Sequence, residues 1–278
     1  MRTIVHLSDL HFGALDPGLL EPLLETVQRL DPHVTVVSGD LTQRAKPQQF
    51  IEAKRFLAQL PKPQVVVPGN HDVPLYNVYQ RFFTPLGRYT RFITSNLEPW
   101  FADDEIAVAG INTARSFVFK GGRIAEDRIA EVAKKFCALP ESVTKVVVTH
   151  HPFDVPGDHK ENQIVGRAAK AMEAFTQCGA DLFLAGHLHL SHAESTSERY
   201  QHEGRGGLVV QAGTATSTRE RGETNSFNCL RVERGSVHID RYQWDTGRGN
   251  FVLGRAEAYD HNGQGWKPRL AGLRTAGG

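Results

Sequence analysis

Residues 64–72 read Gln-Val-Val-Val-Pro-Gly-Asn-His-Asp, an apolar run that ends in a glycine and three polar side chains. Three consecutive valines without polar alternation indicate a strand that is buried on both faces. Gly69 allows the chain to leave this strand in a tight turn. Adjacent polar side chains directly after an apolar run have no packing role. The stretch therefore predicts a functional loop at the end of a buried strand.

The same arrangement recurs four more times along the chain. Apolar runs at 3–7, 34–37, 145–148 and 182–185 lead into Asp9-Leu10-His11, Gly39-Asp40, His150-His151 and Gly186-His187-Leu188-His189. In open α/β sheets the loops converge beyond the carboxyl ends of the strands. Five strand ends are thus expected to deliver Asp, Asn and His side chains to one place. Five of the 13 histidines of the chain belong to this set, namely His11, His71, His150, His187 and His189.

Segments with helical spacing of apolar residues separate these runs and predict helices near 20–30, 50–60, 129–136 and 165–175. Strands that alternate with helices indicate an α/β fold. After about residue 190, the segments 208–212, 227–232 and 237–244 favour hairpins or a meander.

Two regions fit neither pattern. The aromatic-rich stretch 74–101 is interpreted as buried packing or as a lid. From Arg248 onward the chain is Gly-rich with few aliphatic residues, which predicts an extended tail or an oligomer arm. The predicted division is a catalytic domain over 1–247 and a tail over 248–278, with a homo-oligomer as one possible state.

Composition limits the class of partner. The chain has 278 residues, 40% hydrophobic and 23% charged, which is typical of a globular domain. Its 32 Lys and Arg residues balance 31 Asp and Glu residues, leaving +1. This balance gives no global electrostatic attraction to nucleic acid or to anionic lipid.

Cysteine usage and the start of the chain bear on location. Cys137, Cys178 and Cys229 are odd in number and widely spaced, so a disulfide framework or a cysteine-based zinc site is not expected. The first residues have no long apolar region typical of a signal peptide, and no stretch approaches the roughly 18 apolar residues of a membrane span. A cytoplasmic location is predicted.

The order Asp-x-His, Gly-Asp, Gly-Asn-His-Asp, His, Gly-His-x-His resembles the calcineurin-like metallophosphoesterases, from Asp9 to His189. The resemblance implies an α/β fold with four layers, α/β/β/α: a sandwich of two mixed β-sheets flanked by helices, with a binuclear metal site at the carboxyl ends of strands. It implies that one metal takes Asp9, His11 and His189, and the other Asn70, His150 and His187. Asp40 would bridge the two, and His71 would be catalytic. His150 is preferred over His151 because the ligand of the family stands two residues before a proline, here Pro152.

The implied cofactors are two divalent metal ions. Ligation by imidazole, carboxylate and amide without thiolate favours Mn, Fe or Zn over a site for Mg alone. The implied mechanism is in-line attack on phosphorus by a hydroxide that bridges the metals, with His71 protonating the leaving oxygen as general acid.

Departures from other branches of the family narrow the resemblance. Gln43 stands where serine/threonine protein phosphatases have an Asp and where purple acid phosphatases have a ligating Tyr. The Gly-Asp-x-Phe-Asp form of a group of repair nucleases is also absent. The pattern is most similar to that of the class III cyclic nucleotide phosphodiesterases. Because Gln43 is not a carboxylate, Asp72 or a backbone carbonyl is expected to orient His71.

The preferred function is hydrolysis of a small phosphodiester, with a 3′,5′-cyclic nucleotide as the first candidate. One alternative is a UDP-2,3-diacylglucosamine pyrophosphatase, which would need an apolar groove that only 74–101 could supply. A nuclease is disfavoured by the +1 balance, and a binding module without turnover by the intact ligand set.

A few further side chains are candidates for contact with substrate. Asn112 and Arg115 follow an apolar run at 106–111 and could face the substrate or form a structural salt bridge. Arg219 or Arg221 could reach a phosphate or lie on a charged surface hairpin. His192 is interpreted as a residue behind the ligands or on the surface.

Overall fold

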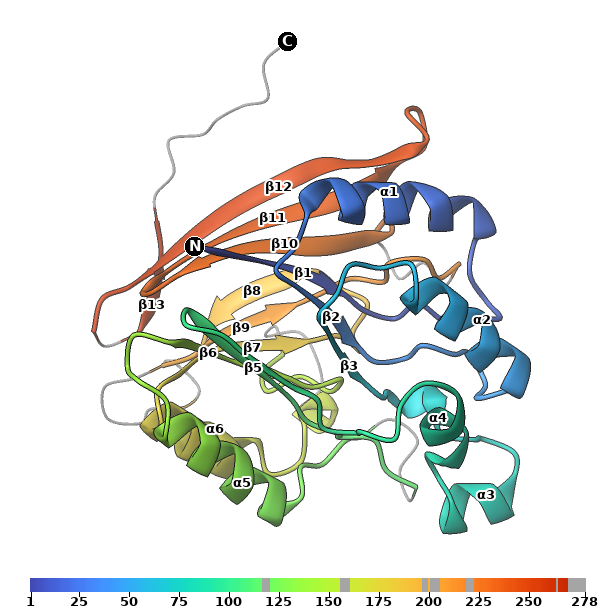
Figure 1. Ribbon diagram of the computed structural model, residues 1–278, viewed down its shortest axis with the longest axis horizontal. Helices are drawn as coiled ribbons and strands as arrows, with labels where there is room; N and C mark the ends of the chain where they lie inside the picture. The colour runs from blue at the N-terminus through green and yellow to red at the C-terminus, as the bar shows by residue number, and fades with distance from the viewer. Residues whose placement is uncertain are drawn as a thin grey trace.

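The computed structural model describes residues 1–116, 121–155, 161–196, 200, 206–218, 223–263 and 265–269. Two mixed β-sheets pack face to face, with helices on both outer surfaces (Figure 1). This is the expected four-layer α/β/β/α sandwich. No helix in the described part of the chain is long and apolar enough to span a bilayer.

The first sheet has seven strands. Its parallel part is β1-β2-β3, and β10 to β13 continue it from the other side of β1 as an antiparallel meander. In the order in which they pair, its strands are β13 (Trp266–Pro268), β12 (Asn250–His261), β11 (Ser236–Asp245), β10 (Ser226–Glu233), β1 (Arg2–Leu7), β2 (Val34–Ser38) and β3 (Gln64–Val67).

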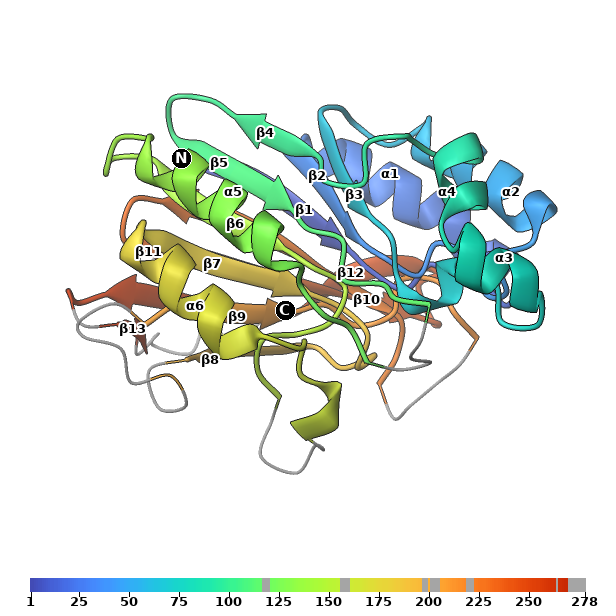
Figure 2. The same cartoon turned by 90° about the horizontal axis from the view of Figure 1, so that it is seen from below.

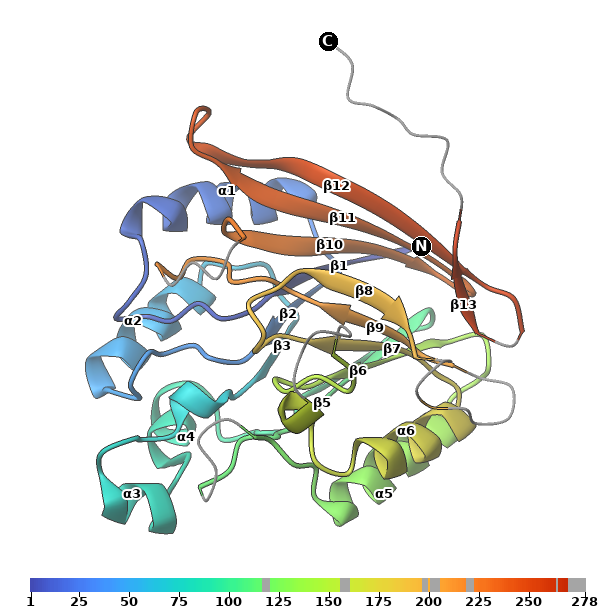
Figure 3. The ribbon, with the colours of Figure 1, turned by 180° about the vertical axis from the view of Figure 1, so that it is seen from behind.

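The second sheet has six strands. Its centre is parallel, and β4 and β8 pair antiparallel at the two edges. Its order is β4 (Trp100–Ala102), β5 (Ile106–Gly110), β6 (Thr144–Val148), β7 (Ala180–Ala185), β9 (Leu208–Gln211) and β8 (His192–Ser195). Figure 3 shows β8 beside β9 at this edge, with the β10–β11–β12 meander above it.

Successive side chains of the central strands enter different cores, which explains why the strands show no polar alternation. Ile4 packs between the sheets, whereas its neighbour Val5 faces the helices that cover the first sheet. In the second sheet, Val146 packs between the sheets and Val147 faces the other helical layer. Both faces of these strands are therefore apolar and buried.

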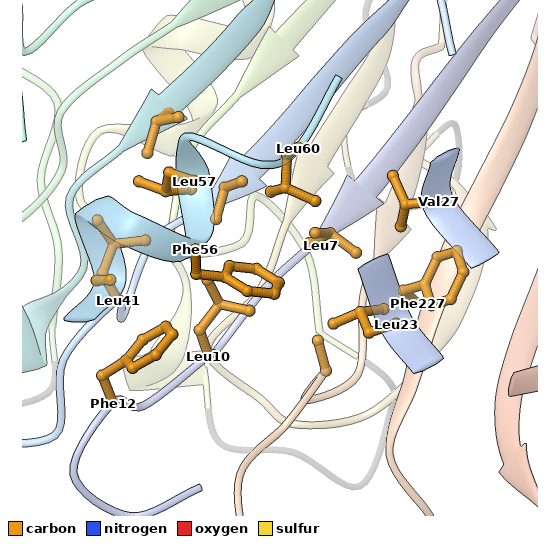
Figure 4. Packing of buried hydrophobic residues seen from close by; sticks show 14 of the residues in the cluster. Leu7, Leu10, Phe12, Leu23, Val27, Leu41, Phe56, Leu57, Leu60 and Phe227 are labelled. Atoms are coloured by element: carbon orange, nitrogen blue, oxygen red, sulfur yellow. The ribbon is translucent and has the colours of Figure 1, made fainter. Parts of the chain in front are cut away.

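The helical layers are built from the predicted amphipathic segments. Helices α1 (Leu20–Leu30) and α2 (Pro47–Leu57) cover the first sheet, and Figure 4 shows Leu23, Val27 and Phe56 packed toward Leu7 and Leu10. Helices α5 (Glu126–Cys137) and α6 (Ala168–Gln177) lie side by side on the second sheet (Figure 2). The shorter elements are α3 (Val78–Phe83), α4 (Gly87–Phe92) and the 3₁₀ turns η1 (Pro17–Leu19), η2 (Asn70–Asp72) and η3 (Glu161–Gln163).

The prediction of a tail from residue 248 is wrong for the described residues. Residues 250–261 form β12, which pairs with β11 from Asn250 to Asp260 with one bulge, and 266–268 form β13. The strand has few aliphatic residues because most of its central side chains are exposed, while Phe251 and Tyr259 are buried near its ends. Residues 270–278 lie outside the described residues.

The structure contains one disulfide, between Cys137 and Cys178, and Cys229 is a buried free thiol. The wide spacing that argued against disulfides is misleading here. Cys137 is the last residue of α5 and Cys178 caps the end of α6. Because the two helices lie side by side, a separation of 41 residues in sequence becomes direct contact.

The aromatic stretch 74–101 divides into a buried and an exposed part. Tyr89 is fully buried, and its hydroxyl donates to the backbone oxygen of Val66 at 3.1 Å. In contrast, Tyr76, Tyr79 and Phe83 are 78%, 71% and 72% exposed. Buried packing is thus correct for α4, whereas α3 presents aromatic rings to solvent.

Candidate metal centre

The predicted ligands come together at the carboxyl ends of parallel strands from both sheets. Asp9 and His11 follow β1, Asp40 follows β2, and Asn70 and His71 lie in η2 after β3; His150 follows β6, and His187 and His189 follow β7. Backbone bonds tie these loops to one another. The amide of His11 donates to the oxygen of Asp40 at 3.0 Å, and that of Gly186 donates to the oxygen of His150 at 3.1 Å.

One group of ligand atoms comprises Asp9, His11 and His189, all buried. The Nε2 atoms of the two histidines face each other at 3.4 Å, and they lie 3.5 and 3.2 Å from Asp9 Oδ1. This buried Oδ1 forms no hydrogen bond with any of the described residues. Two imidazole nitrogens and an orphaned carboxylate oxygen in one place fit a divalent cation, so these residues could hold a metal.

Asp40 lies between this group and a second one. Its Oδ2 is 3.8 Å from His11 Nε2, whereas its Oδ1 is 3.4 Å from His150 Nε2. The Oδ1 of Asn70 is 3.0 Å from the same His150 nitrogen. The ring of His187 stands edge-on to that of His150, with 5.1 Å between centroids. One carboxylate thus faces both groups, as a bridging ligand must.

His150 and its neighbour His151 differ in what holds them. The Nδ1 of His150 lies 2.8 Å from the backbone oxygen of Ser38, which requires Nδ1–H to donate and leaves Nε2 as the ligand atom. His151 instead binds Thr113 Oγ1 through Nδ1 at 2.8 Å, and its buried Nε2 forms no hydrogen bond in the part of the chain that the structure describes. Both rings have a nitrogen close to His187. His150, His151 and His187 together form a group that could hold a metal, so the preference for His150 over His151 stays a prediction.

A backbone carbonyl orients His71. Of the two groups expected for this task, Asp72 or a backbone carbonyl, the structure therefore shows the second. The Nδ1 of His71 lies 2.9 Å from the oxygen of Gln43, so Nδ1 carries the proton. Asp72 turns away and accepts from the amides of Gly69 and Thr42, both at 2.9 Å. Its role is to tie η2 to the loop after β2.

The backbone around the ligands is strained. Eight non-glycine residues in the described part of the chain have a positive φ, a conformation that L residues adopt rarely. Five of the eight are predicted ligands: Asp9 (54°), His11 (52°), Asp40 (52°), His187 (73°) and His189 (59°). Each such residue costs about 1–3 kcal/mol and persists only where the surroundings enforce it. This concentration marks the cluster as functional.

The three glycines that precede ligands are needed for close approach, as expected. A Cβ on Gly69 would lie 2.1 Å from Asp40 Oδ1, and one on Gly186 would lie 1.8 Å from Ser8 Oγ. On Gly39 it would lie 2.7 Å from His150 Nδ1, and Gly39 also has a φ of 93°. No larger residue fits at these positions without moving a ligand.

Electrostatics in the protein without metal show how strongly the ligands interact. Despite burial, the nearby histidines hold the pKa of Asp9 and of Asp40 well below the usual range. Burial alone would lower the pKa of His150, but Asp40 and Asp9 raise it to about 9. Burial and the neighbouring His150 lower the pKa of His187 to about 3. Burial and Asp40 raise the pKa of Asp72 to about 6.

Several supporting residues were not predicted from the sequence. Ser8 donates to Asp9 Oδ2 at 2.6 Å, and Thr113 and Gly122 pack against the His151 ring. A polar residue at the end of an apolar run was the available signal for Ser8 and Thr113. Among the secondary candidates, Asn112 and Arg115 line one pocket and His192 pairs with Glu194 on the surface, whereas Arg219 and Arg221 lie outside the described residues.

Fold and site together define a metallophosphoesterase. Residues 2–191 match the family model described as calcineurin-like phosphoesterase, and the chain belongs to this family. The chain spans about three fifths of the length of the curated relative that it matches.

Individual relatives are distant. A protein named YpbG from Bacillus subtilis (strain 168), described as uncharacterized, is 27% identical over 191 residues, which are 67% of this chain and 61% of YpbG. The purple acid phosphatase PPD1 from yellow lupin (Lupinus luteus) is 12% identical with a TM-score of 0.63, and the match covers 94% of this chain and 54% of PPD1. A dimetal phosphatase from Danio rerio is 12% identical with a TM-score of 0.59, over 86% of this chain and 95% of that one. These structures show the shared fold.

Proposed function

We propose that the protein hydrolyses a small phosphodiester, with 3′,5′-cyclic nucleotides as the first candidate substrates. The observation that carries this proposal is the orientation of His71 by the carbonyl of Gln43. A catalytic histidine held by a carbonyl, at the position where protein phosphatases place a carboxylate, agrees with the resemblance to cyclic nucleotide phosphodiesterases.

The residues of the site have distinct tasks in this proposal. Asp9, His11 and His189 would hold one divalent ion, and Asn70, His150 and His187 the other, with Asp40 shared. Such ions supply water activated at neutral pH and a positive field for the phosphoryl group. Two divalent ions against two carboxylates leave a net positive charge, which attracts a phosphodiester anion although the whole chain is nearly neutral.

In this proposal His71 acts as general acid. Its Nδ1 donates to Gln43, so its Nε2 points toward the ligands and lies 4.0 Å from Asp40 Oδ2. A proton on this Nε2 can be transferred to the departing oxygen of the ester. The neighbouring bond from the His71 amide to Asp40 Oδ1, at 2.8 Å, fixes the acid relative to the shared carboxylate.

The direct test is a hydrolysis panel with the protein loaded with Mn²⁺. Bis-p-nitrophenyl phosphate and cyclic AMP should be cleaved without detergent, and p-nitrophenyl phosphate should be cleaved more slowly. A clear preference for the monoester would contradict the proposal. Element analysis of the protein as purified identifies the metal.

A second candidate is an amphiphilic substrate such as UDP-2,3-diacylglucosamine, and α3 is the observation that favours it. This helix follows the loop of His71, and its exposed aromatic residues continue from Tyr76, whose ring lies 5.8 Å from the guanidinium of Arg44. An enzyme of this kind should prefer the acylated substrate in micelles, and Tyr79→Ser with Phe83→Ser should remove that preference. If the double variant and the parent hydrolyse the acylated substrate in micelles at equal rates, the small diester is the better-supported substrate.

A further inference from the structure

A pocket of about 340 Å³ lies at the carboxyl end of β5, beside the metal centre, and it is rich in arginine. Four arginines and one acidic residue line it, together with Asn112: the charged residues are Arg115, Arg123, Arg128, Arg167 and Glu98. Such a concentration of guanidinium groups is unexpected in a chain whose net charge is only +1.

The pocket is connected to the metal centre through His151. Thr113, which binds His151 Nδ1, lies in the chain between Asn112 and Ala114, and both of these residues line the pocket. Gly122, which precedes Arg123, packs so closely on the ring that a Cβ there would lie 2.2 Å from His151 Nδ1. The ring centroid of His151 is in turn 4.6 Å from that of His187. One layer of side chains thus separates the pocket from the predicted ligands.

Two of the arginines have their charge compensated. Arg167 pairs with Glu126 at 3.2 Å and donates to the backbone oxygen of Ile124 at 2.8 Å. Arg128 pairs with Glu98 at 3.0 Å and also with Glu131. These contacts fix the walls of the pocket.

Arg115 and Arg123 differ, because neither forms an ion pair with an acidic residue in the described ranges. The stem of Arg123 is held over Gly166, where a Cβ would lie 3.1 Å from Arg123 Cγ. Asn112 accepts from the amide of Ala114 with Oδ1, which leaves its NH₂ group as a donor. Two guanidinium groups that form no ion pair within the described ranges therefore line the same small space as an amide donor, although Arg123 also interacts electrostatically with Glu126.

We propose that this pocket binds a second phosphate group of the substrate whose phosphodiester lies at the metal centre. Arginine presents planar pairs of N–H donors that match phosphate oxygens, which lysine cannot do. The inference rests on the proposed function and narrows it: the substrate carries a phosphate in addition to the diester. A 3′,5′-cyclic nucleoside monophosphate lacks this group and would use the metal centre alone.

The first experiment measures binding without turnover. Inorganic pyrophosphate is titrated calorimetrically into the full-length protein freed of metal, whose circular dichroism is first shown to match that of the loaded protein. The double variant Arg115→Gln/Arg123→Gln should bind at least about tenfold more weakly, because each charge-assisted bond contributes substantially. Arg248→Gln is the matched control, since Arg248 is exposed on the turn between β11 and β12, and it should bind as the parent does. Equal affinity in the double variant and the parent would overturn the proposal.

The second experiment decides whether the phosphate belongs to the substrate. The Mn²⁺-loaded protein is given thymidine 5′-(4-nitrophenyl phosphate) and the same diester carrying a 3′-phosphate, with nitrophenolate release as the readout for both. The parent should show a kcat/KM about tenfold or more higher for the phosphorylated diester, and the double variant should lose this preference. Pyrophosphate binding combined with equal kcat/KM for the two diesters would overturn the assignment to substrate, because the pocket would then serve a separate anion. If neither diester is hydrolysed, the proposed function fails, and the binding experiment still decides whether the pocket takes phosphate.

Discussion

The Nδ1 atom of His71 lies 2.9 Å from the backbone oxygen of Gln43, and its Nε2 lies 4.0 Å from Asp40 Oδ2. A carbonyl oxygen can only accept, so this contact fixes both the tautomer and the direction of the ring. With one proton held on Nδ1, only the doubly protonated imidazolium carries a second proton on Nε2, the nitrogen that lies toward Asp40 and the predicted metal ligands. The orientation of His71, the predicted acid, therefore depends on the backbone path after β2.

Replacing His71 with alanine should lower kcat for bis-p-nitrophenyl phosphate by about 10²–10⁴ and leave the metal content unchanged. His71 contributes a proton and not a ligand in the proposed mechanism. Gln43→Ala is the matched control and should have a much smaller effect, because the contact uses the backbone oxygen. Loss of metal from His71→Ala, measured by element analysis, would show that His71 is a ligand.

Replacing Asp40 with alanine should remove both metals, whereas His189→Ala should weaken the binding of only one. Asp40 faces His11 with one oxygen and His150 with the other, while His189 contacts only the group around Asp9. Metal content after dialysis distinguishes the two variants. Retention of about one ion per chain in Asp40→Ala would contradict the shared role of this carboxylate.

The sequence predicted the parts of the molecule that follow from burial and topology. Strands buried on both faces require unbroken apolar runs, and parallel strands bring their carboxyl ends to one edge. These two facts placed Asp9 beside His189, although 180 residues separate them in the chain. The strand ends carry the predicted ligands, and polar residues there stand out against the apolar run.

Other features leave no sequence signature of their own. The carbonyl that orients His71 is present at every residue, so only the fold shows which one is used. Strand β12 has exposed central residues and a bulge at Gly254, opposite Arg241 and Tyr242 of β11, which together hide its alternation. The arginine pocket draws on residues before β4, after β5 and at the starts of α5 and α6, segments that only the folded chain brings together.

Replacing Gly69 with alanine should lower the free energy of unfolding by more than about 2 kcal/mol and reduce metal content. The added Cβ would lie 2.1 Å from Asp40 Oδ1 and 2.3 Å from the Asp40 amide nitrogen, so the shared carboxylate must move. Gly247→Ala is the control, because its Cβ would meet only Asp245 Oδ1 at 3.3 Å on an exposed turn. Urea unfolding measures both variants, and equal values would mean that the loop around Asp40 is not constrained.

Metal binding at pH 7.5 should release about one proton from His150. Asp40 and Asp9 raise the pKa of this buried histidine to about 9, so it is protonated before a metal binds, and a ligand must be neutral. Metal affinity should therefore rise with pH until that pKa is passed. Calorimetry with Mn²⁺ in two buffers of different ionisation enthalpy gives the number of protons released.

Two variants identify the histidine that releases the proton. His150→Gln should abolish the release, whereas His151→Gln should not, because burial and the adjacent histidines lower the pKa of His151 well below its usual range. If proton release instead depended on His151, then His151 would be the metal ligand and His150 its neighbour, which would contradict the prediction.

The disulfide between Cys137 and Cys178 should stabilise the protein by about 2–4 kcal/mol, because it closes a long loop across α5 and α6. Cytosolic thiols are normally kept reduced, so this bond and the prediction of a cytoplasmic location lead to different expectations. Cys137→Ser should lower the free energy of unfolding without reductant, and the difference from the parent should shrink when both proteins are measured in reductant. Whether the disulfide is present in the cell is then decided by adding an alkylating reagent to intact cells and unfolding the protein while the reagent is still present. Every reduced cysteine, including the buried Cys229, is modified under these conditions. Three modified cysteines would indicate a reducing compartment, whereas modification of Cys229 alone would indicate an oxidising one and contradict the cytoplasmic prediction.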